Sequence, residues 1–425
     1  MYDRATLAVV GGAIVLATAL AVNRAVPEPY MDEIFHIPQM QRYAAHDPWR
    51  DPKITTPDLL YHYTIALGKV LQPLLGPHIT SVAFTRATNT FGLLLLPLVL
   101  YAAAPTASFA KIAALVTLPP LWFFGFLYYT DIWSVLCVFA MLGCTRHYRH
   151  ILASLCGAIA LCFRQNNVVW VLFACGAAVL DVLERYAVRH KEPRSRAILF
   201  LANPDCLMRA VAVFLPYTIP LAGFGAFVKI NGGVALGDRA NHTFTLHLAQ
   251  LGYFFAFAAV FGWPSLCSLA LRMRITRIHM LAFVVLTACG MFCVYYGTVV
   301  HPFVLADNRH YFFYVWRRII DVHPYSRFAL VPIYAASATV FILALSRVRS
   351  PMWAFGFVLA TALALVPAPL VEPRYMLVPY MLMRMQLPGS PLEVVSNTLI
   401  NAATMYLFLY RPFSWPDGSL QHFMW

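Results

Sequence analysis

Charged residues are scarce in this sequence. Only 12% of its 425 residues are Asp, Glu, Lys or Arg, whereas 60% are hydrophobic. That charged share is about half of what a soluble globular protein carries, and the mean hydropathy is +0.67. The composition therefore excludes an ordinary soluble domain and predicts an all-α protein that crosses a membrane several times.

The sequence also lacks several common functional signatures. It contains no GxxxxGK[ST] loop, no HExxH and no GxSxG. The sequence therefore lacks the usual signatures of ATP-driven transporters, zinc-dependent proteases and serine hydrolases. The nine cysteines lie in expected spans or in the basic connectors between them, so we expect neither a disulfide framework nor a cysteine-based metal site.

A membrane-crossing helix needs about 20 apolar residues, and this length predicts about twelve spans in a single membrane domain over residues 1–425. The apolar run after Arg4 is too long for the hydrophobic region of a signal peptide, so we expect it to remain as the first span. Segment 59–75 is less apolar and is expected to lie on the membrane surface. The expected spans are 5–24, 80–103, 108–129, 131–145, 150–165, 167–183, 208–228, 245–270, 279–300, 325–346, 352–371 and 395–411.

Basic residues cluster in short connectors, which the positive-inside rule assigns to the cytosol. The formal net charge of +13 is interpreted mainly as headgroup anchoring at helix ends. Four segments rich in ionisable and aromatic residues then lie together on the opposite, luminal side, where we expect the chemistry. They are 29–61, 237–243, 301–321 and 370–380.

The luminal segment 29–61 contains adjacent acids, Asp32 and Glu33, after a proline-rich stretch. The apolar residues that follow predict a short amphipathic helix on the membrane. One carboxylate at its N-terminus can serve as a general base. The alternative interpretation is a helix cap, because acids are common at helix starts.

Two further luminal motifs carry arginine. Asp307-Asn-Arg309-His310-Tyr311, followed by Arg318, is suited to binding a phosphate, although its aromatic residues also resemble a membrane-interface belt. In Glu372-Pro-Arg374, the arginine is either a second phosphate ligand or the ion-pair partner of the glutamate. Arg164-Gln-Asn166-Asn is either a turn or a polar cavity lining, and Asn241-His-Thr243 is a glycosylation sequon.

Together these motifs resemble one family closely. YMDEIFHIPQ, WRDPKITTP, GDRANH, HPFVLADNRHYFFYVWRR and LVEPRY occur in the order typical of the endoplasmic-reticulum α-1,2-glucosyltransferases that use dolichyl phosphate glucose. Asp58 departs from the family pattern, in which a second Pro and a Gly are expected after TTP. The resemblance implies a GT-C architecture with a structured first luminal loop and an inverting transfer of the terminal glucose to the diglucosylated lipid-linked oligosaccharide.

The resemblance also implies roles for individual residues. The catalytic pair is Asp32 as base with Glu33 as an orienting group, and the reverse order stays open. The donor-phosphate ligands are expected to be Arg309, His310, Arg374, Lys53 and Arg318. The acceptor ligands are expected to be Trp49, His36, Asp307, Asp238 and Asn166.

The implied partners are dolichyl phosphate glucose, the dolichyl-diphosphate oligosaccharide and the bilayer of the endoplasmic reticulum, with no nucleic acid. No cofactor is required, because fixed cations can stabilise the leaving phosphate, and dependence on a divalent metal stays open. A related polyprenyl-phosphate-sugar transferase, for example a mannosyltransferase, is the nearest alternative. A transporter or scramblase is a more distant one, because the ionisable residues gather at one face and not at mid-membrane.

Overall fold

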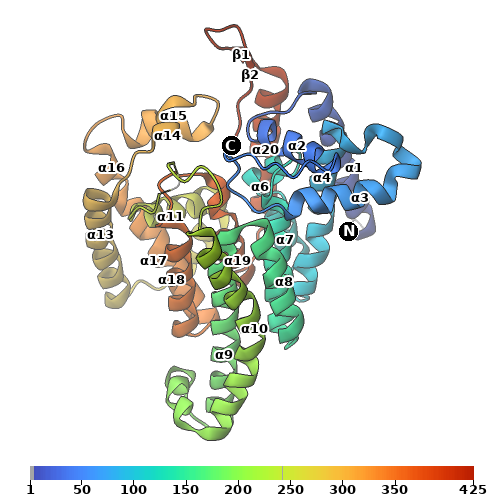
Figure 1. Cartoon of the computed structure of the whole chain (residues 1–425). Coiled ribbons are helices and arrows are strands. Elements are labelled where there is room, and N and C mark those ends of the chain that lie inside the picture. The colour runs from blue at the N-terminus through green and yellow to red at the C-terminus, as the bar shows by residue number, and fades with distance from the viewer. Residues whose placement is uncertain (1–3, 242) are drawn as a thin grey trace.

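The structure is a computed structural model that describes residues 4–241 and 243–425 (Figure 1). Its described residues form helices and one two-stranded antiparallel sheet, which confirms the expected helical class. The first elements are α1 (Arg4–Ala25), α2 (Glu33–Ala44), α3 (Leu59–Leu75), η1 (Gly76–Thr80), α4 (Val82–Ala103), α5 (Phe109–Val116), α6 (Pro119–Phe124), α7 (Asp131–Arg146), α8 (His150–Phe163), η2 (Gln165–Asn167), α9 (Val168–Arg189) and η3 (Arg194–Ala202).

The second half of the chain is also mainly helical and ends with the two-stranded sheet. Its elements are α10 (Pro204–Asn231), α11 (Gln250–Phe261), α12 (Trp263–Arg272), α13 (Arg277–Gly297), α14 (Pro302–Ala306), α15 (Tyr311–Val315), η4 (Trp316–Ile320), α16 (Ser326–Ala329), α17 (Val331–Val348), α18 (Pro351–Leu365), η5 (Pro373–Met376), α19 (Leu377–Gln386), α20 (Pro391–Tyr410), β1 (Phe413–Ser414) and β2 (Leu420–Gln421).

The long apolar helices make the protein polytopic, but they are fewer than the twelve spans expected. Within the described residues, six helices are long and apolar enough to cross a membrane, or seven if one bent pair counts as a span. Shorter apolar helices cover Val9–Ala25, His150–Phe163 and Pro351–Leu365. The six candidate spans are Val82–Ala103, Gln165–Arg189, Pro204–Asn231, Arg277–Gly297, Ser326–Val348 and Pro391–Tyr410.

Two expected spans are corrected by the structure, and proline or glycine stands at both breaks. The segment 108–129 is not one helix, because α5 ends before Pro119 and α6 starts there. Proline lacks the N–H that would continue a helix, and it disfavours helical geometry in the preceding residue. The segment 245–270 bends by 92° between α11 and α12, where Gly262 precedes Pro264.

The first polar segment forms the expected short helix, although Ile34 of its apolar pattern is 52% exposed. α2 begins at Glu33 and buries Ile37 and Met40, and α3 covers the whole segment expected to lie on the membrane. The loop between these helices contacts residue Gly237 of a distant segment, where an added Cβ would lie 2.3 Å from the Ile54 backbone oxygen. A side chain at position 237 would therefore displace the loop.

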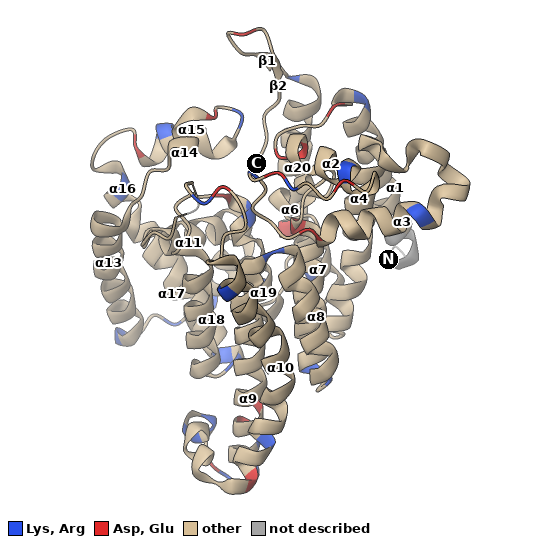
Figure 2. Ribbon diagram, viewed as in Figure 1, with Lys and Arg blue, Asp and Glu red and all other residues tan. Residues whose placement is uncertain are grey.

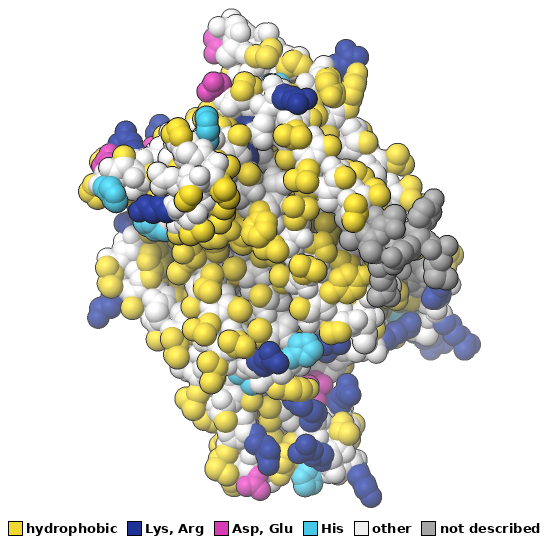
Figure 3. Space-filling view, turned by 90° about the vertical axis from the view of Figure 1, so that its right-hand side faces the viewer, with side chains coloured by type: hydrophobic (Ala, Val, Ile, Leu, Met, Phe, Trp, Pro, Cys, Tyr) yellow, Lys and Arg dark blue, Asp and Glu magenta, His cyan; other side chains and the backbone are white. Residues whose placement is uncertain are grey.

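The helix connections fall at two ends of the molecule. One end, which we call the site end, carries α2, α3, α14, α15 and the two strands, and it contains the polar segments that were expected to share one side (Figures 1 and 2). Residue His242, within the second of these segments (237–243), lies outside the described residues. The other end, which we call the basic end, carries the connections α7–α8, α9–α10, α12–α13 and α17–α18. A broad band of hydrophobic side chains covers the surface between the two ends (Figure 3).

Candidate active site

Asp32 stands directly before α2, where a carboxylate often caps a helix. Its side chain makes no capping hydrogen bond. Instead its carboxylate accepts a hydrogen bond from Arg374 Nη1 at 3.0 Å, and its backbone N–H donates to the Tyr129 hydroxyl at 3.2 Å. The Asp32 side chain is 38% exposed. The structure therefore disfavours the capping interpretation and leaves this carboxylate accessible.

Arg374, in η5, gathers acids from three parts of the chain. It pairs with Glu372 and Asp32, and Asp131 Oδ2 lies 4.0 Å from its Nη1. The guanidinium also lies 5.2 Å from the centre of the Tyr129 ring. Burial alone would lower the pKa of Arg374, but the charges of these three acids raise it well above its ordinary value. Arg374 is therefore a permanent cation shared among carboxylates.

The same contact sets the protonation of Asp32. Burial acts to raise the pKa of Asp32, but the charge and hydrogen bond of Arg374 outweigh it, so the pKa is lowered below the ordinary value of 3.8. Burial lowers the pKa of neighbouring His36 to about 4. At neutral pH Asp32 is therefore an anion, and the His36 ring, 2.6 Å from the Tyr61 hydroxyl, is neutral.

A cavity of about 410 Å³ opens beside Asp32 at the site end. Arg374 and Asp32 line one wall, and Asp307, Arg309 and His310 line another. The structure thus joins a base candidate to three of the expected phosphate ligands, although the sequence separates these residues by more than 270 positions. The apolar lining includes Phe124, Phe303, Phe313, Trp415 and Trp425.

Arg309 is fixed by contacts on several sides. Its Nε and Nη2 each donate to a carboxylate oxygen of Asp307 at 2.8 Å, and its Nη1 donates to Gln421 Oε1 at 3.1 Å. The guanidinium also lies 4.6 Å from the ring centre of Trp415. Burial acts to raise the pKa of Asp307, but the hydrogen bonds from Arg309 lower it overall. Asp307 therefore neutralises and orients Arg309, and its oxygens are occupied.

The last residues of the chain complete this wall, a role that no sequence motif indicated. Met424 pairs with the backbone on both sides of His310: its N–H donates to the Arg309 carbonyl at 2.9 Å, and its carbonyl accepts from the Tyr311 N–H at 2.9 Å. His310 Nδ1 lies 2.9 Å from the Trp425 backbone oxygen. Its other ring nitrogen is 3.7 Å from Asp307.

Glu33 lies apart from the cavity, in a fully buried ion pair. Its two oxygens accept hydrogen bonds from Arg86 Nη2 at 2.6 Å and Nε at 2.9 Å, and from the backbone N–H groups of Tyr30 and Tyr128. Arg86 also donates to the carbonyls of Val26 and Glu28. Every oxygen of Glu33 is thus engaged in joining α4 to the chain that leads into α2, and this arrangement fits a structural role.

Several other expected ligands do not reach the cavity of Asp32. Trp49 is exposed, with the Arg42 guanidinium 4.3 Å from its ring centre. Lys53 lies over Phe35, and Arg318 lies over Tyr314. The Asp238 backbone N–H donates to Pro52, and its carboxylate accepts from Asn241 at 2.9 Å.

Asn166 lines a second cavity of about 640 Å³, which adjoins the first through Phe303 and Leu370. Its lining is apolar along α9 and α18 and polar near Arg164 and Arg239. The Arg164-Gln-Asn166 motif therefore lines a cavity and also forms the turn η2.

Sequence reasoning missed Asp131, the first residue of α7. Asp131 is 2% exposed and pairs through one oxygen with Arg164, while the other oxygen has no hydrogen-bond partner among the described residues. It lies between Arg164, which lines the second cavity, and Arg374, which lines the first. An acid at the start of an apolar span was the available signal, whereas Asp32 was marked by its adjacent acid and by the amphipathic helix that follows. Within the described part of the chain, no three His, Cys, Asp or Glu residues are placed to hold a metal ion.

The fold and this site define a class: a polytopic membrane protein with a carboxylate–guanidinium cavity at one end of its helices. The chain belongs to the DIE2/ALG10 family, whose profile matches residues 26–385.

Named relatives extend over nearly the whole chain. It is 34% identical to the Dol-P-Glc:Glc(2)Man(9)GlcNAc(2)-PP-Dol alpha-1,2-glucosyltransferase of Mus musculus, with 95% of each protein covered. It is 32% identical to the proteins of the same name from Arabidopsis thaliana, with 97% of each covered, and from Homo sapiens, with 95% of each covered. No solved structure matches the chain.

Proposed function

We propose that this chain transfers glucose from dolichyl phosphate glucose to the lipid-linked oligosaccharide Glc2Man9GlcNAc2 and forms the terminal α-1,2 linkage. The relatives that share 95% or more of its length carry this activity in their names. The observation that carries the proposal is the cavity in which the accessible, ionised Asp32 meets Arg374, Arg309 and His310. Glucose transfer from a lipid phosphate requires a base and a set of cations.

The reaction is an inverting displacement. Asp32 takes the proton of the acceptor 2-hydroxyl as that oxygen attacks the anomeric carbon, and the bond to the dolichyl phosphate oxygen breaks on the opposite face. The departing phosphate needs no proton, because the fixed charges of Arg374 and Arg309 stabilise it in a site of low dielectric. Since the donor is β-linked, the product linkage is α.

Arg374 couples donor binding to the strength of the base. Without donor it holds the pKa of Asp32 down, which makes Asp32 a weak base. A bound donor phosphate competes for the same guanidinium and weakens its hold on Asp32. The pKa of Asp32 then rises toward the range that favours proton abstraction, so the base gains strength only when a donor is present.

The second cavity suits the isoprenoid chain of a substrate. Its lining along α9 and α18 is apolar, and it adjoins the first cavity through Phe303 and Leu370. This arrangement supports a GT-C transferase whose site end faces the lumen of the endoplasmic reticulum.

The direct test is glucose transfer by the full chain in liposomes. Dolichyl phosphate glucose and dolichyl phosphate mannose would be compared as donors to Glc2Man9GlcNAc2-diphosphate-dolichol. We expect transfer of glucose alone, at an α-1,2 linkage identified by NMR. Transfer from the mannosyl donor only, by a protein that remains folded, would overturn the proposal.

Arg374→Gln is expected to lower kcat/KM for the donor about 10²- to 10³-fold, the usual cost of losing one transition-state donor. Arg318→Gln is the matched control, because Arg318 is a cation at the same end that lies outside the cavity. The control variant should keep the activity of the unmodified chain. Equal losses of activity in both variants would show that Arg374 contributes only positive charge to this end of the molecule and makes no specific contact with the donor.

The pH profile gives a separate prediction. The kcat/KM profile reports the free enzyme, in which Asp32 stays ionised, so we expect it to be flat from pH 7 down to about pH 5. Arg374→Gln removes the charge that lowers the pKa of Asp32, so the acid limb should move to higher pH. Profiles of the residual activity measure this, and an acid limb at the same pH in both proteins would contradict it.

A further inference from the structure

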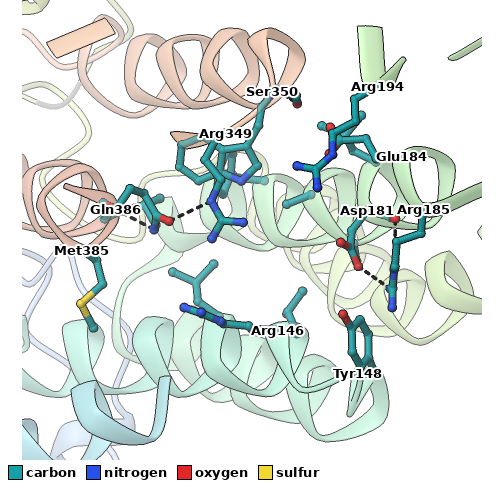
Figure 4. A pocket seen from close by; sticks show the side chains of 18 of the residues that line it. Arg146, Tyr148, Asp181, Glu184, Arg185, Arg194, Arg349, Ser350, Met385 and Gln386 are labelled. Carbon is teal, nitrogen blue, oxygen red and sulfur yellow. Dashed lines mark hydrogen bonds and ion pairs between the residues drawn. The ribbon is translucent and has the colours of Figure 1, made fainter. Parts of the chain in front are cut away.

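A third cavity, of about 540 Å³, lies at the basic end, on the opposite side of the molecule from Asp32 (Figure 4). The ends of α7, α9 and α19 and the start of α18 surround it. Nothing in the proposed transfer reaction uses this cavity.

Three arginines from three different elements aim into this cavity. Figure 4 shows the guanidinium groups of Arg146, Arg194 and Arg349 approaching a common space from α7, η3 and the turn before α18. Among the residues that the structure describes, none of the three forms an ion pair. An unoccupied cluster of like charges is unfavourable, and an anion at its centre would relieve the repulsion.

Neighbouring charges do not neutralise the cluster. The cavity is lined by five arginines and two acids, Asp181 and Glu184, which leaves a formal surplus of three positive charges. Asp181 is already paired with Arg185. Burial and the charges of Arg146 and Arg194 lower the pKa of Arg349, and the opposing charges of Asp181 and Glu184 offset this lowering only in part.

Arg349 is also held in place by its neighbours. Its Nε donates to Gln386 Oε1 at 2.9 Å, and its guanidinium lies 5.4 Å from the ring centre of Trp353. Arg146 and Arg194 are exposed, as are Arg149 and Arg347 on neighbouring positions of the same connections, whereas Arg349 is half-buried. The inward, half-buried position of Arg349 is typical of a binding site.

An apolar groove continues from the cationic cavity between α9 and α18. Its volume is about 370 Å³, and no charged residue lines it. It shares Phe173, Leu180 and Trp353 with the cavity above. A cationic chamber that leads into an apolar groove between membrane helices matches a phosphate headgroup joined to a hydrocarbon chain.

We propose that the cavity at the basic end binds an anionic phospholipid, whose headgroup phosphate lies among Arg146, Arg194 and Arg349 and whose acyl chain lies in the groove between α9 and α18. The groove favours a membrane lipid over a free phosphate, because a soluble anion would leave the apolar lining exposed to water. The lipid comes from the leaflet at the basic end, which makes this site independent of glucose transfer at the other end.

The test uses the full chain in a neutral detergent, supplied with equimolar phosphatidic acid and phosphatidylcholine and analysed by native mass spectrometry. We expect phosphatidic acid to be retained preferentially. The double variant Arg146→Gln/Arg349→Gln should weaken its binding about 30-fold, because each cation near the membrane surface changes the affinity about fivefold. The matched control is Arg149→Gln/Arg347→Gln, which removes the same charge from the same connections and should keep the preference.

Soluble pyrophosphate at millimolar concentration separates the two sources of phosphate. We expect it to leave the bound phosphatidic acid in place. Full displacement by pyrophosphate, or binding of pyrophosphate without any preference between the two lipids, would overturn the lipid assignment. Equal losses in the double variant and its control would overturn the site itself, and unchanged thermal unfolding of both variants excludes misfolding as the cause.

Discussion

Replacing Asp32 by Asn is expected to lower kcat for glucose transfer about 10²- to 10⁴-fold, the range that a positioned general base contributes. The amide keeps the shape of the side chain but cannot accept the proton of the acceptor hydroxyl. Donor binding should persist or tighten, because Arg374 loses one of the acids that compete with the donor phosphate. Turnover in liposomes and binding of dolichyl phosphate glucose by the same protein measure the two effects separately.

Asp307→Asn is the appropriate comparison for this prediction. Asp307 lines the same cavity, but its oxygens are occupied by Arg309. Its replacement releases Arg309 and should alter KM for the donor more than kcat. If Asp32→Asn keeps full turnover while Asp307→Asn loses it, the base is Asp307 and the proposed assignment is wrong.

The short helix α2 and the helix α3 that follows it could be predicted from sequence, because local apolar spacing indicates a helix. Ile37 and Met40 are buried as that spacing predicts, whereas Ile34 is 52% exposed and Glu33 is buried in its ion pair with Arg86. The division of roles between Asp32 and Glu33 could not be predicted. It depends on Arg374 and Arg86, which lie 342 and 53 positions away in the sequence, and such pairings leave no local pattern.

The membrane spans show where a length criterion fails. Continuous apolar segments such as Val82–Ala103 and Arg277–Gly297 were predicted closely, because nothing interrupts their helices. At Pro119 and at Gly262 the composition stays apolar while the backbone breaks. Hydropathy measures how a segment partitions into the membrane and does not report helix continuity, so it assigned single spans to segments whose helices are broken.

The far wall of the cavity depends on tertiary structure alone. Trp425 and Met424 reach His310 through backbone hydrogen bonds, which any residues could form. Asp131 was overlooked because a single acid at a helix start is usually a favourable charge for the helix dipole. Its burial and its contact with Arg164 become evident only when α7 and α8 are packed together.

Replacing Glu33 by Gln is expected to lower the free energy of unfolding by about 3 to 5 kcal/mol, because it leaves Arg86 as an unpaired charge in a buried site. The side chains of Arg86 and Glu33 are 1% and 0% exposed, and no other acid pairs with Arg86 among the described residues. Thermal unfolding of the full chain in detergent measures the loss as a lower midpoint.

Asp32→Asn is the control for this stability prediction, since its side chain is 38% exposed and Arg374 keeps Glu372 as a partner. That variant should unfold close to the midpoint of the unmodified chain. The two substitutions would then have different effects. Asp32→Asn would remove activity and keep stability, whereas Glu33→Gln would lower stability. An Asp32→Asn protein that unfolds as early as Glu33→Gln would instead mean that Asp32 is needed to hold α2 against η5, and its loss of turnover would no longer identify a base.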